Sequence, residues 1–235
     1  GKIAISDYHN QRVVIYGNKG ALSAAQALGV TNLTSLGTDS LGFQAVALRN
    51  NQLFVAVSHY SENGEGLPNS PANKIFHYNL EQNASNFVKP QRVFGQAYNE
   101  STQELPGNDC NRGKGTASHD TLCEVTDLFV DANDTLWVVD SGNYRVLWFD
   151  SPTDSSQLEA TTADGVVGQV DFKGNAAWAP NTPEEAPYRF KGPAGIGVDG
   201  QGTLWVADKS SDRILSFPTP KEKNAATGMP KATTV

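Results

Sequence analysis

The chain has little positive charge, little cysteine and no long apolar run. Its 18 Lys and Arg residues are outnumbered by 25 Asp and Glu, which gives a net charge of −7 and a pI near 5.0. Nucleic acid requires a basic stripe, so this balance argues against binding to it. No apolar run approaches the length that spans a bilayer, so no membrane insertion is expected. With neither an initiator Met nor a signal peptide, Gly1 is expected to be a processed terminus or a cut.

The usual sequence signatures of catalysis are also lacking. There is no G-x-S-x-G elbow and no H-E-x-x-H helix. Residues 195–200 spell G-x-G-x-x-G, but a strand at 203–206 follows them, where a dinucleotide site needs a helix. Residues 111–116 resemble a phosphate loop, but a Gly separates the Lys from the Thr, which are adjacent in that motif. These residues therefore favour a flexible turn. We therefore expect no nucleotide cofactor.

What the chain does have is repetition. Residues 125–149 predict three strands, at 127–131, 135–140 and 145–149, separated by Asp, Asn and Gly turns. The same pattern recurs at 194–217, where Leu-Trp-Val and the following Asp and Arg keep their spacing. A fragment opens the chain at 3–16, and a looser copy lies at 43–78. Internal repetition is thus the main feature of the sequence.

Each repeat ends in a shared segment that supplies a fourth strand. Val-Phe-Gly-Gln at 93–96 and Val-Val-Gly-Gln at 166–169 follow two of the repeats, and Ala-Leu-Gly-Val at 27–30 follows the first. Four-stranded antiparallel units repeated at this length predict the blades of an all-β propeller. We expect a single domain over 1–235, with a partial blade at about 1–30 and blades at about 41–96, 124–169 and 193–235.

These residues resemble the NHL-repeat β-propellers. The NHL blade pattern, roughly P-x-G-I-A-V-D-x-x-G-x-L-Y-V-A-D-x-x-N-x-R-V, is met closely at 193–214 and at 125–146. The resemblance is greater still to the subgroup with V-x-G-Q linkers and a loop of paired cysteines. It covers nearly the whole chain and implies the fold, whereas propellers of this kind carry unrelated activities.

The number of blades does not decide whether they form a closed ring. About three and a half to four blades are visible, whereas a closed propeller has at least four. One hypothesis is a segment of a larger propeller, or a protomer whose blade edges pair with protein partners or further copies of itself. The alternative is a ring of four blades closed by pairing the C-terminal tail with the first strand.

An Asp and an Arg five residues apart recur across a tight hairpin. The pairs are Asp7 with Arg12, Asp140 with Arg145, and Asp208 with Arg213. We interpret them as structural ion pairs that hold the hairpin by charge-assisted hydrogen bonds. In the second blade, Ser58 stands at the expected Asp and Lys74 replaces the Arg after a long polar insertion.

The only two cysteines lie near the ends of one loop. A disulfide between Cys110 and Cys123 would close about fourteen residues and stabilise the fold by roughly 3 kcal/mol. It would also indicate an oxidising compartment. Two buried free thiols are the alternative. A change of two mass units on reduction distinguishes them.

Four sequons for N-glycosylation lie in expected turns or loops. They begin at Asn32, Asn83, Asn99 and Asn133. With the disulfide, they favour an extracellular or secreted protein that carries glycans.

A candidate ligand face follows from the topology. In a propeller the turn after the second strand and the loop before the first strand share one face, so ligand contacts are expected there. The residues that this face gathers are His9, His59, Tyr60, Asn143 and Tyr144, with Tyr8 and Gly142.

Metal binding depends on four histidines and one acidic turn. A lyase of the peptide-amidating pathway resembles an NHL propeller with histidine-bound zinc, but only His9 and His59 can share a face here, while catalytic zinc needs three ligands. The Asp131–Asp134 turn lacks the Glu that ends a calcium loop. We expect no metal and no cofactor.

The sequence thus favours a non-enzymatic extracellular binding or structural module, in a larger and conceivably fibrous assembly. The alternative is a metal-dependent lyase or hydrolase on the same propeller, or a ligand-sensing ectodomain. Stoichiometric zinc or calcium in the purified protein would favour the enzyme.

Overall fold

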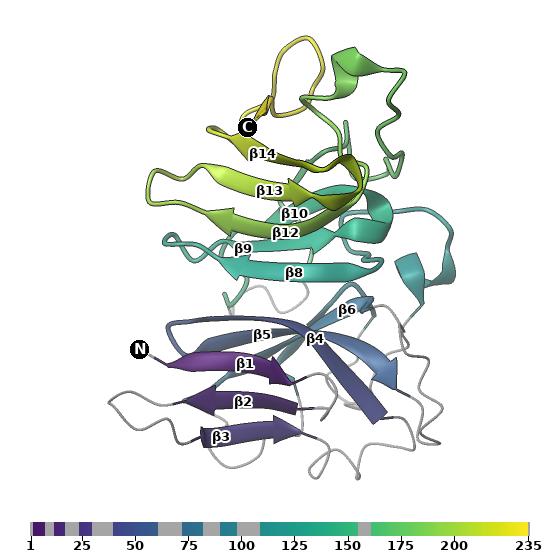
Figure 1. The fold of residues 1–235 in the computed structure, drawn as a ribbon. Helices are drawn as coiled ribbons and strands as arrows, with labels where there is room; N and C mark the ends of the chain where they lie inside the picture. The colour runs from purple at the N-terminus through teal and green to yellow at the C-terminus, as the bar shows by residue number, and fades with distance from the viewer. Residues whose placement is uncertain are drawn as a thin grey trace.

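The computed structural model describes residues 2–7, 12–16, 24–29, 40–60, 72–81, 90–97, 109–154 and 161–234. The regular structure in these ranges consists of β-strands and short 3-10 turns, arranged as four separate antiparallel sheets (Figure 1). No helix in the described ranges is long and apolar enough to cross a membrane. The all-β prediction is confirmed.

The strands of each sheet are paired in chain order, as in a propeller blade, and we call the four sheets blades 1 to 4. Blade 1 contains β1 (Ile3–Asp7), β2 (Arg12–Tyr16) and β3 (Ala24–Gly29). Blade 2 contains β4 (Ser40–Arg49), β5 (Gln52–Tyr60), β6 (Lys74–Asn79) and β7 (Arg92–Phe94). Blade 3 contains β8 (Val125–Val130), β9 (Leu136–Asp140), β10 (Arg145–Phe149) and β11 (Gly165–Val167). Blade 4 contains β12 (Pro193–Val198), β13 (Leu204–Asp208), β14 (Arg213–Phe217) and β15 (Thr233–Thr234).

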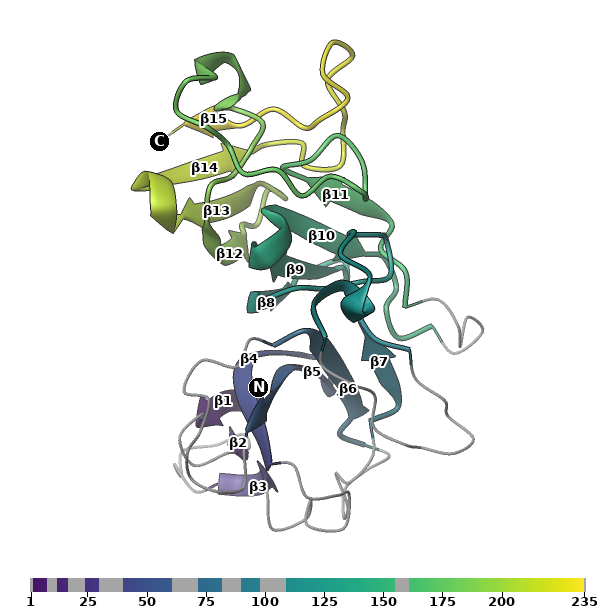
Figure 2. The ribbon, with the colours of Figure 1, turned by 90° about the vertical axis from the view of Figure 1, so that its right-hand side faces the viewer.

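The blades follow one another as a fan. The first strands of neighbouring blades lie next to each other, so that β4 contacts β1 and β8, and β8 contacts β12. Blades 1 and 4 lie at opposite ends of the fan (Figures 1 and 2). The alternative of a ring closed by the C-terminal tail does not describe this structure, because β15 pairs with β14 of its own sheet rather than with the first strand.

Three apolar layers hold the blades together, one between each pair of neighbours. Blades 1 and 2 meet around Val13, Ile15 and Leu53. Blades 2 and 3 meet around Phe54 and Leu136, together with other side chains of both sheets. Blades 3 and 4 meet around Trp137, Val206, Phe217 and their neighbours. Because alternate residues of a strand point to opposite faces, a blade between two others is apolar on both faces.

The strand register relates one blade to the next. The innermost strands carry a bulge at the same place, between Phe43 and Ala45, Val125 and Asp127, and Pro193 and Gly195. Across the second hairpin, Arg145 lies opposite Asp140, whereas Lys74 lies opposite Val57. Val57 therefore occupies the Asp position, and the prediction that Ser58 does so is wrong, because residues 53–57 align without a gap with Leu136–Asp140.

An aspartate closes the first hairpin of blades 3 and 4. Asp131 Oδ1 accepts the backbone N–H of Asn133 and Thr135, and Oδ2 accepts the Trp137 indole N–H at 2.9 Å. Asp199 does the same in blade 4, where the Trp205 indole donates at 3.0 Å. The side chain thus fixes both the turn and the tryptophan that follows it.

Candidate functional site

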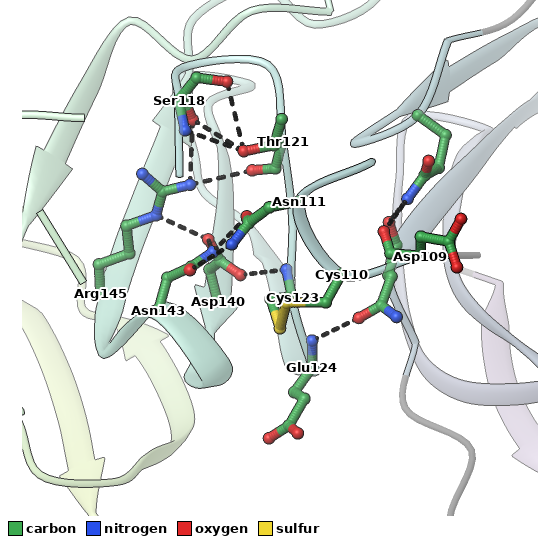
Figure 3. Close-up of a disulfide and its surroundings, with 12 residues drawn as sticks. Asp109, Cys110, Asn111, Ser118, Thr121, Cys123, Glu124, Asp140, Asn143 and Arg145 are labelled. Atoms are coloured by element: carbon green, nitrogen blue, oxygen red, sulfur yellow. Dashed lines mark hydrogen bonds and ion pairs between the residues drawn. A yellow bond between two sulfur atoms is a disulfide. The ribbon is translucent and has the colours of Figure 1, made fainter. Parts of the chain in front are cut away.

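The turn between β9 and β10 lies against the loop that leads into blade 3 (Figure 3). The turn is a short 3-10 segment, η4 (Ser141–Asn143), followed by Tyr144 at a left-handed φ of 52°. Cys110 and Cys123 form a disulfide with an S–S distance of 2.02 Å. The disulfide is present where the two cysteines predict it, and it fixes this loop beside the first strand of the blade.

A buried ion pair lies beneath this turn. Arg145 Nε and Asp140 Oδ2 are 2.6 Å apart, and both side chains are 0% exposed. Asp140 also accepts the Cys123 backbone N–H at 2.6 Å and the Asn143 amide at 2.8 Å. Burial raises the pKa of the Asp140 carboxyl, and the Arg145 guanidinium opposes that rise. The three donors hold the carboxylate within the protein.

The other end of Arg145 holds the loops on both sides of the blade. Its guanidinium donates to the backbone carbonyls of Ser118 and Thr121 at 3.0 and 2.9 Å, and to that of Phe172 at 2.6 Å. The amides of Asn111 and Asn143 exchange two hydrogen bonds of 2.9 Å. We call the ion pair with its bound loop carbonyls the loop clamp.

Blade 4 contains a second loop clamp. Asp208 and Arg213 are 2.9 Å apart, with side chains 0% and 12% exposed. Asp208 accepts the backbone N–H groups of Lys191 and Gly192, at 3.0 and 2.7 Å. Arg213 donates to two loop carbonyls and lies 4.4 Å from the centre of the Trp178 ring. In blade 1, Asp7 lies opposite Arg12 in the register, and the Arg12 side chain is outside the described residues.

The expected ligand face is described only in part. The side chains of His9, His59 and Tyr60 lie outside the described residues. Asn143 is 1% exposed and its amide is bonded to Asp140 and Asn111, while Tyr144 is half-buried. The described part of this face therefore serves to hold the loop.

One of the four sequons can be placed. Asn133 is exposed in the turn between β8 and β9. The other three, Asn32, Asn83 and Asn99, lie outside the described residues.

A pocket in the described ranges lies at the other end of blades 2 and 3. It holds about 200 Å³ and is lined by the β4–β5 turn, the β8–β9 turn and Pro152 with Thr153. Arg49 and Asp134 form an exposed ion pair of 3.2 Å at its rim. Ligand pockets usually hold about 300 to 1,000 Å³, so this one is small. Within the described ranges, no three His, Cys, Asp or Glu side chains group as metal ligands.

An acidic side chain on an innermost strand is the better chemical candidate. Asp127 of β8 is half-buried and lies between the first strands of blades 3 and 4. Its Oδ2 accepts the backbone N–H of Ile196 at 2.9 Å, and its Oδ1 accepts that of Leu128 at 2.9 Å. Burial raises the pKa of Asp127, and these two hydrogen bonds oppose the rise. A carboxyl with a raised pKa in such a position is typical of acid–base groups.

Asp127 was not singled out from the sequence. It belongs to the predicted strand, and an alternating strand pattern does not distinguish a functional acid from a solvated one. Aligning the blades at the bulge makes Asp127 stand out. The residues at the same position in blades 2 and 4 are Ala45 and Gly195, so only blade 3 of these three has an acid there. Gly195 lies beside the carboxyl, since a Cβ there would be in ordinary contact with Asp127 Oδ2, at 3.7 Å.

No protein-family model and no curated protein sequence matches the chain. Solved structures do match it in fold. A luciferin-regenerating enzyme is 16% identical, with 99% of this chain and 57% of that chain covered and a TM-score of 0.44. Virginiamycin B lyase from Staphylococcus aureus is 12% identical, with coverage of 100% and 66% and a TM-score of 0.40. A streptogramin B lyase is 10% identical, with coverage of 100% and 65% and a TM-score of 0.42.

These matches correct one prediction. The three proteins are named as enzymes, which runs against the expectation of a non-enzymatic binding or structural module, and that expectation is not kept. The chain spans about three fifths of the length of these proteins. At this degree of similarity the likeness concerns the fold and assigns no activity to this chain.

Proposed function

We propose that this chain is part of a propeller enzyme of the lyase or hydrolase class, in which Asp127 transfers a proton. The observation that carries the proposal is the half-buried Asp127 carboxyl, whose pKa is raised by burial on the innermost strand of blade 3. Both reaction classes need a group that gives or takes a proton at the reacting atom.

The surroundings of Asp127 suit this role. Two backbone N–H groups, from Ile196 and Leu128, fix the orientation of the carboxyl. The neighbouring Thr126 is exposed at the bulge, and Gly195 adds no side chain beside the carboxyl. A carboxyl held in one orientation can act as an acid when protonated and as a base when ionised.

We also propose that the blades are of the NHL type and that the protein is secreted. The blade pattern at 125–146 and 193–214 supports the first point. The Cys110–Cys123 disulfide and the exposed sequon at Asn133 support the second. Loss of mass after removal of N-glycans from the natural protein would test it, and an unchanged mass would leave the disulfide as its only support.

The test of the enzyme proposal is hydrolysis or elimination with a cyclic ester or peptide lactone, measured against pH. Quinupristin and 6-phosphogluconolactone are practical first probes, because matched structures are named for proteins that bind or act on such compounds. We expect an activity whose pH midpoint lies above the ordinary range of an Asp. We expect Asp127→Asn to lower this activity by about 100-fold or more.

The matched control is Asp212→Asn. Asp212 is exposed at a left-handed φ of 49°, a conformation that Asn adopts readily. This variant should keep full activity, and both variants should unfold at the same denaturant concentration as the unmodified chain. An activity that survives Asp127→Asn with its pH midpoint unchanged would refute the role of Asp127.

A further inference from the structure

The two end blades expose the large apolar side chains of the described residues. Five such side chains are exposed in these ranges, and only Val170 lies away from an end blade sheet. The other four are Ile3 at 59%, Ile5 at 48%, Trp205 at 38% and Ile214 at 48%. Exposure confined to both ends of a fan points to surfaces that normally contact another blade.

On blade 4 the exposed residues match a face that blade 3 buries. Counting along the register from the paired Asp and Arg, Trp205 corresponds to Trp137 and Ile214 to Val146. Trp137 is 1% exposed and Val146 is 0% exposed, because blade 4 covers them. The free face of blade 4 is therefore a second copy of the face on which blade 4 itself is packed.

Trp205 is already oriented for such a contact. Its indole N–H donates to Asp199 at 3.0 Å, as that of Trp137 donates to Asp131 at 2.9 Å. Gly197 lies opposite Trp205 on the neighbouring strand and leaves open space, since no atom lies within 4 Å of where its Cβ would be. A side chain held in its bound orientation loses little conformational entropy when a partner docks.

Blade 1 exposes the complementary half. Ala4 packs toward blade 2, and the Ser6 hydroxyl donates to the Phe43 carbonyl, so Ile3 and Ile5 point to the opposite face. In the register Ile3 and Ile5 correspond to Leu204 and Val206 of blade 4. These two residues are 0% exposed and pack against blade 3.

We propose that the blade 4 face of one copy docks on the blade 1 face of a second copy of this chain. The chain builds this kind of interface three times between its own blades, and its two free faces are the two halves of a fourth. Such a contact is heterologous, with different surfaces from each copy, so it forms a closed ring or a longer oligomer. The inference does not rest on the proposed enzyme function.

The experiment is light scattering on the 235-residue chain after size exclusion, over a range of concentrations. We expect a mass that is a multiple of 25.2 kDa. We expect Trp205→Glu and Ile5→Glu each to shift the chain toward monomer, because each buries a charge in the interface. Val170→Lys, on the loop after β11, is the control and should leave the mass unchanged.

Mixing the two variants gives the decisive result. The Trp205→Glu variant keeps an intact blade 1 face, and the Ile5→Glu variant keeps an intact blade 4 face. Their mixture should form a pair joined by one interface, whereas each variant alone should not. A monomeric unmodified chain at all concentrations, or a mixture that fails to pair, would overturn the proposal. Equal disruption by Val170→Lys would also overturn it.

Discussion

Blades 3 and 4 hold their incoming loops with the same ion pair but cover it differently. In blade 3 the loop is closed by the Cys110–Cys123 disulfide, and the pair is fully buried. In blade 4 no cysteine is present, and Trp178 lies over the guanidinium of Arg213, which stays 12% exposed. The comparison indicates that the Asp and the Arg define the clamp. What covers the ion pair, the disulfide-closed loop in blade 3 or Trp178 in blade 4, determines how deeply the pair is buried.

The largest expected effect comes from breaking the clamp in blade 3. Arg145→Ala would leave Asp140 buried without its ion pair and should lower the free energy of unfolding by about 3 to 5 kcal/mol. Arg213→Ala should cost roughly 2 to 3 kcal/mol, since water reaches that site more easily. Denaturant unfolding of both variants measures the difference. If Arg213→Ala lowers the free energy of unfolding as much as Arg145→Ala or more, the deeper burial of the blade 3 ion pair does not make it the more important one.

Removing the disulfide should leave blade 3, like blade 4, with a loop that is held by the ion pair and no covalent bond. Replacing both Cys110 and Cys123 with Ser opens a loop with a sequence separation of 13. We expect the free energy of unfolding to fall by about 3 kcal/mol, because the unfolded chain gains conformational freedom. Reduction of the unmodified chain should give the same loss by denaturant unfolding. No loss in either experiment would show that the clamp alone orders the loop.

A smaller effect extends the comparison to blade 2, which has His77 where blade 3 has Trp148. Burial, with a contribution from Arg92, lowers the pKa of His77 from 6.5 to about 4. Its Nε2 lies 2.7 Å from Gln52 Oε1 and its Nδ1 has no hydrogen bond, so the neutral ring with a proton on Nε2 fits this site.

Because the folded pKa is the lower one, acid favours the unfolded chain. The stabilising contribution of neutral His77 is complete above pH 6.5 and is lost as the pH falls toward 4. We expect this residue to reduce the free energy of unfolding by about 2 kcal/mol between pH 8 and pH 5. His77→Gln should remove that part of the pH dependence, and His119→Gln, at an exposed position, should not. Identical pH curves for the two variants would refute the assignment.

Much of the fold could be predicted because blade spacing is recorded in the sequence. The strands expected at 135–140 and 145–149 agree with β9 and β10 to within one residue, since Asp and Gly turns bound them. Val57 could be placed from the ungapped match of residues 53–57 with Leu136–Asp140, but it carries no charge, so the Asp–Arg spacing that identifies the clamp elsewhere does not point to it. The sequence left closure of the ring open, because pairing of the tail depends on contacts that no local pattern encodes.

The candidate site was less accessible to sequence reasoning. The two cysteines lay in one loop, so their pairing followed from position. Asp127 did not stand out, since burial raises its pKa and its hydrogen-bond partner Ile196 lies more than 60 residues later in the chain. The exposure of Trp205 was equally hidden, because the same Leu-Trp-Val segment is buried in blade 3 and exposed in blade 4.

Because the blades are arranged as a fan, the stability of the chain is approximately the sum of a contribution from each blade and one from each contact between neighbouring blades. Each blade gains stability from its own strands and from the blades beside it, and within the described residues of one copy blades 2 and 3 contact two neighbours and blades 1 and 4 contact one. Opening therefore begins at the ends and proceeds inward. Within one copy, a change in blade 1 reaches blade 4 through the two blades between them, so the two ends of a single copy behave as nearly independent folding units.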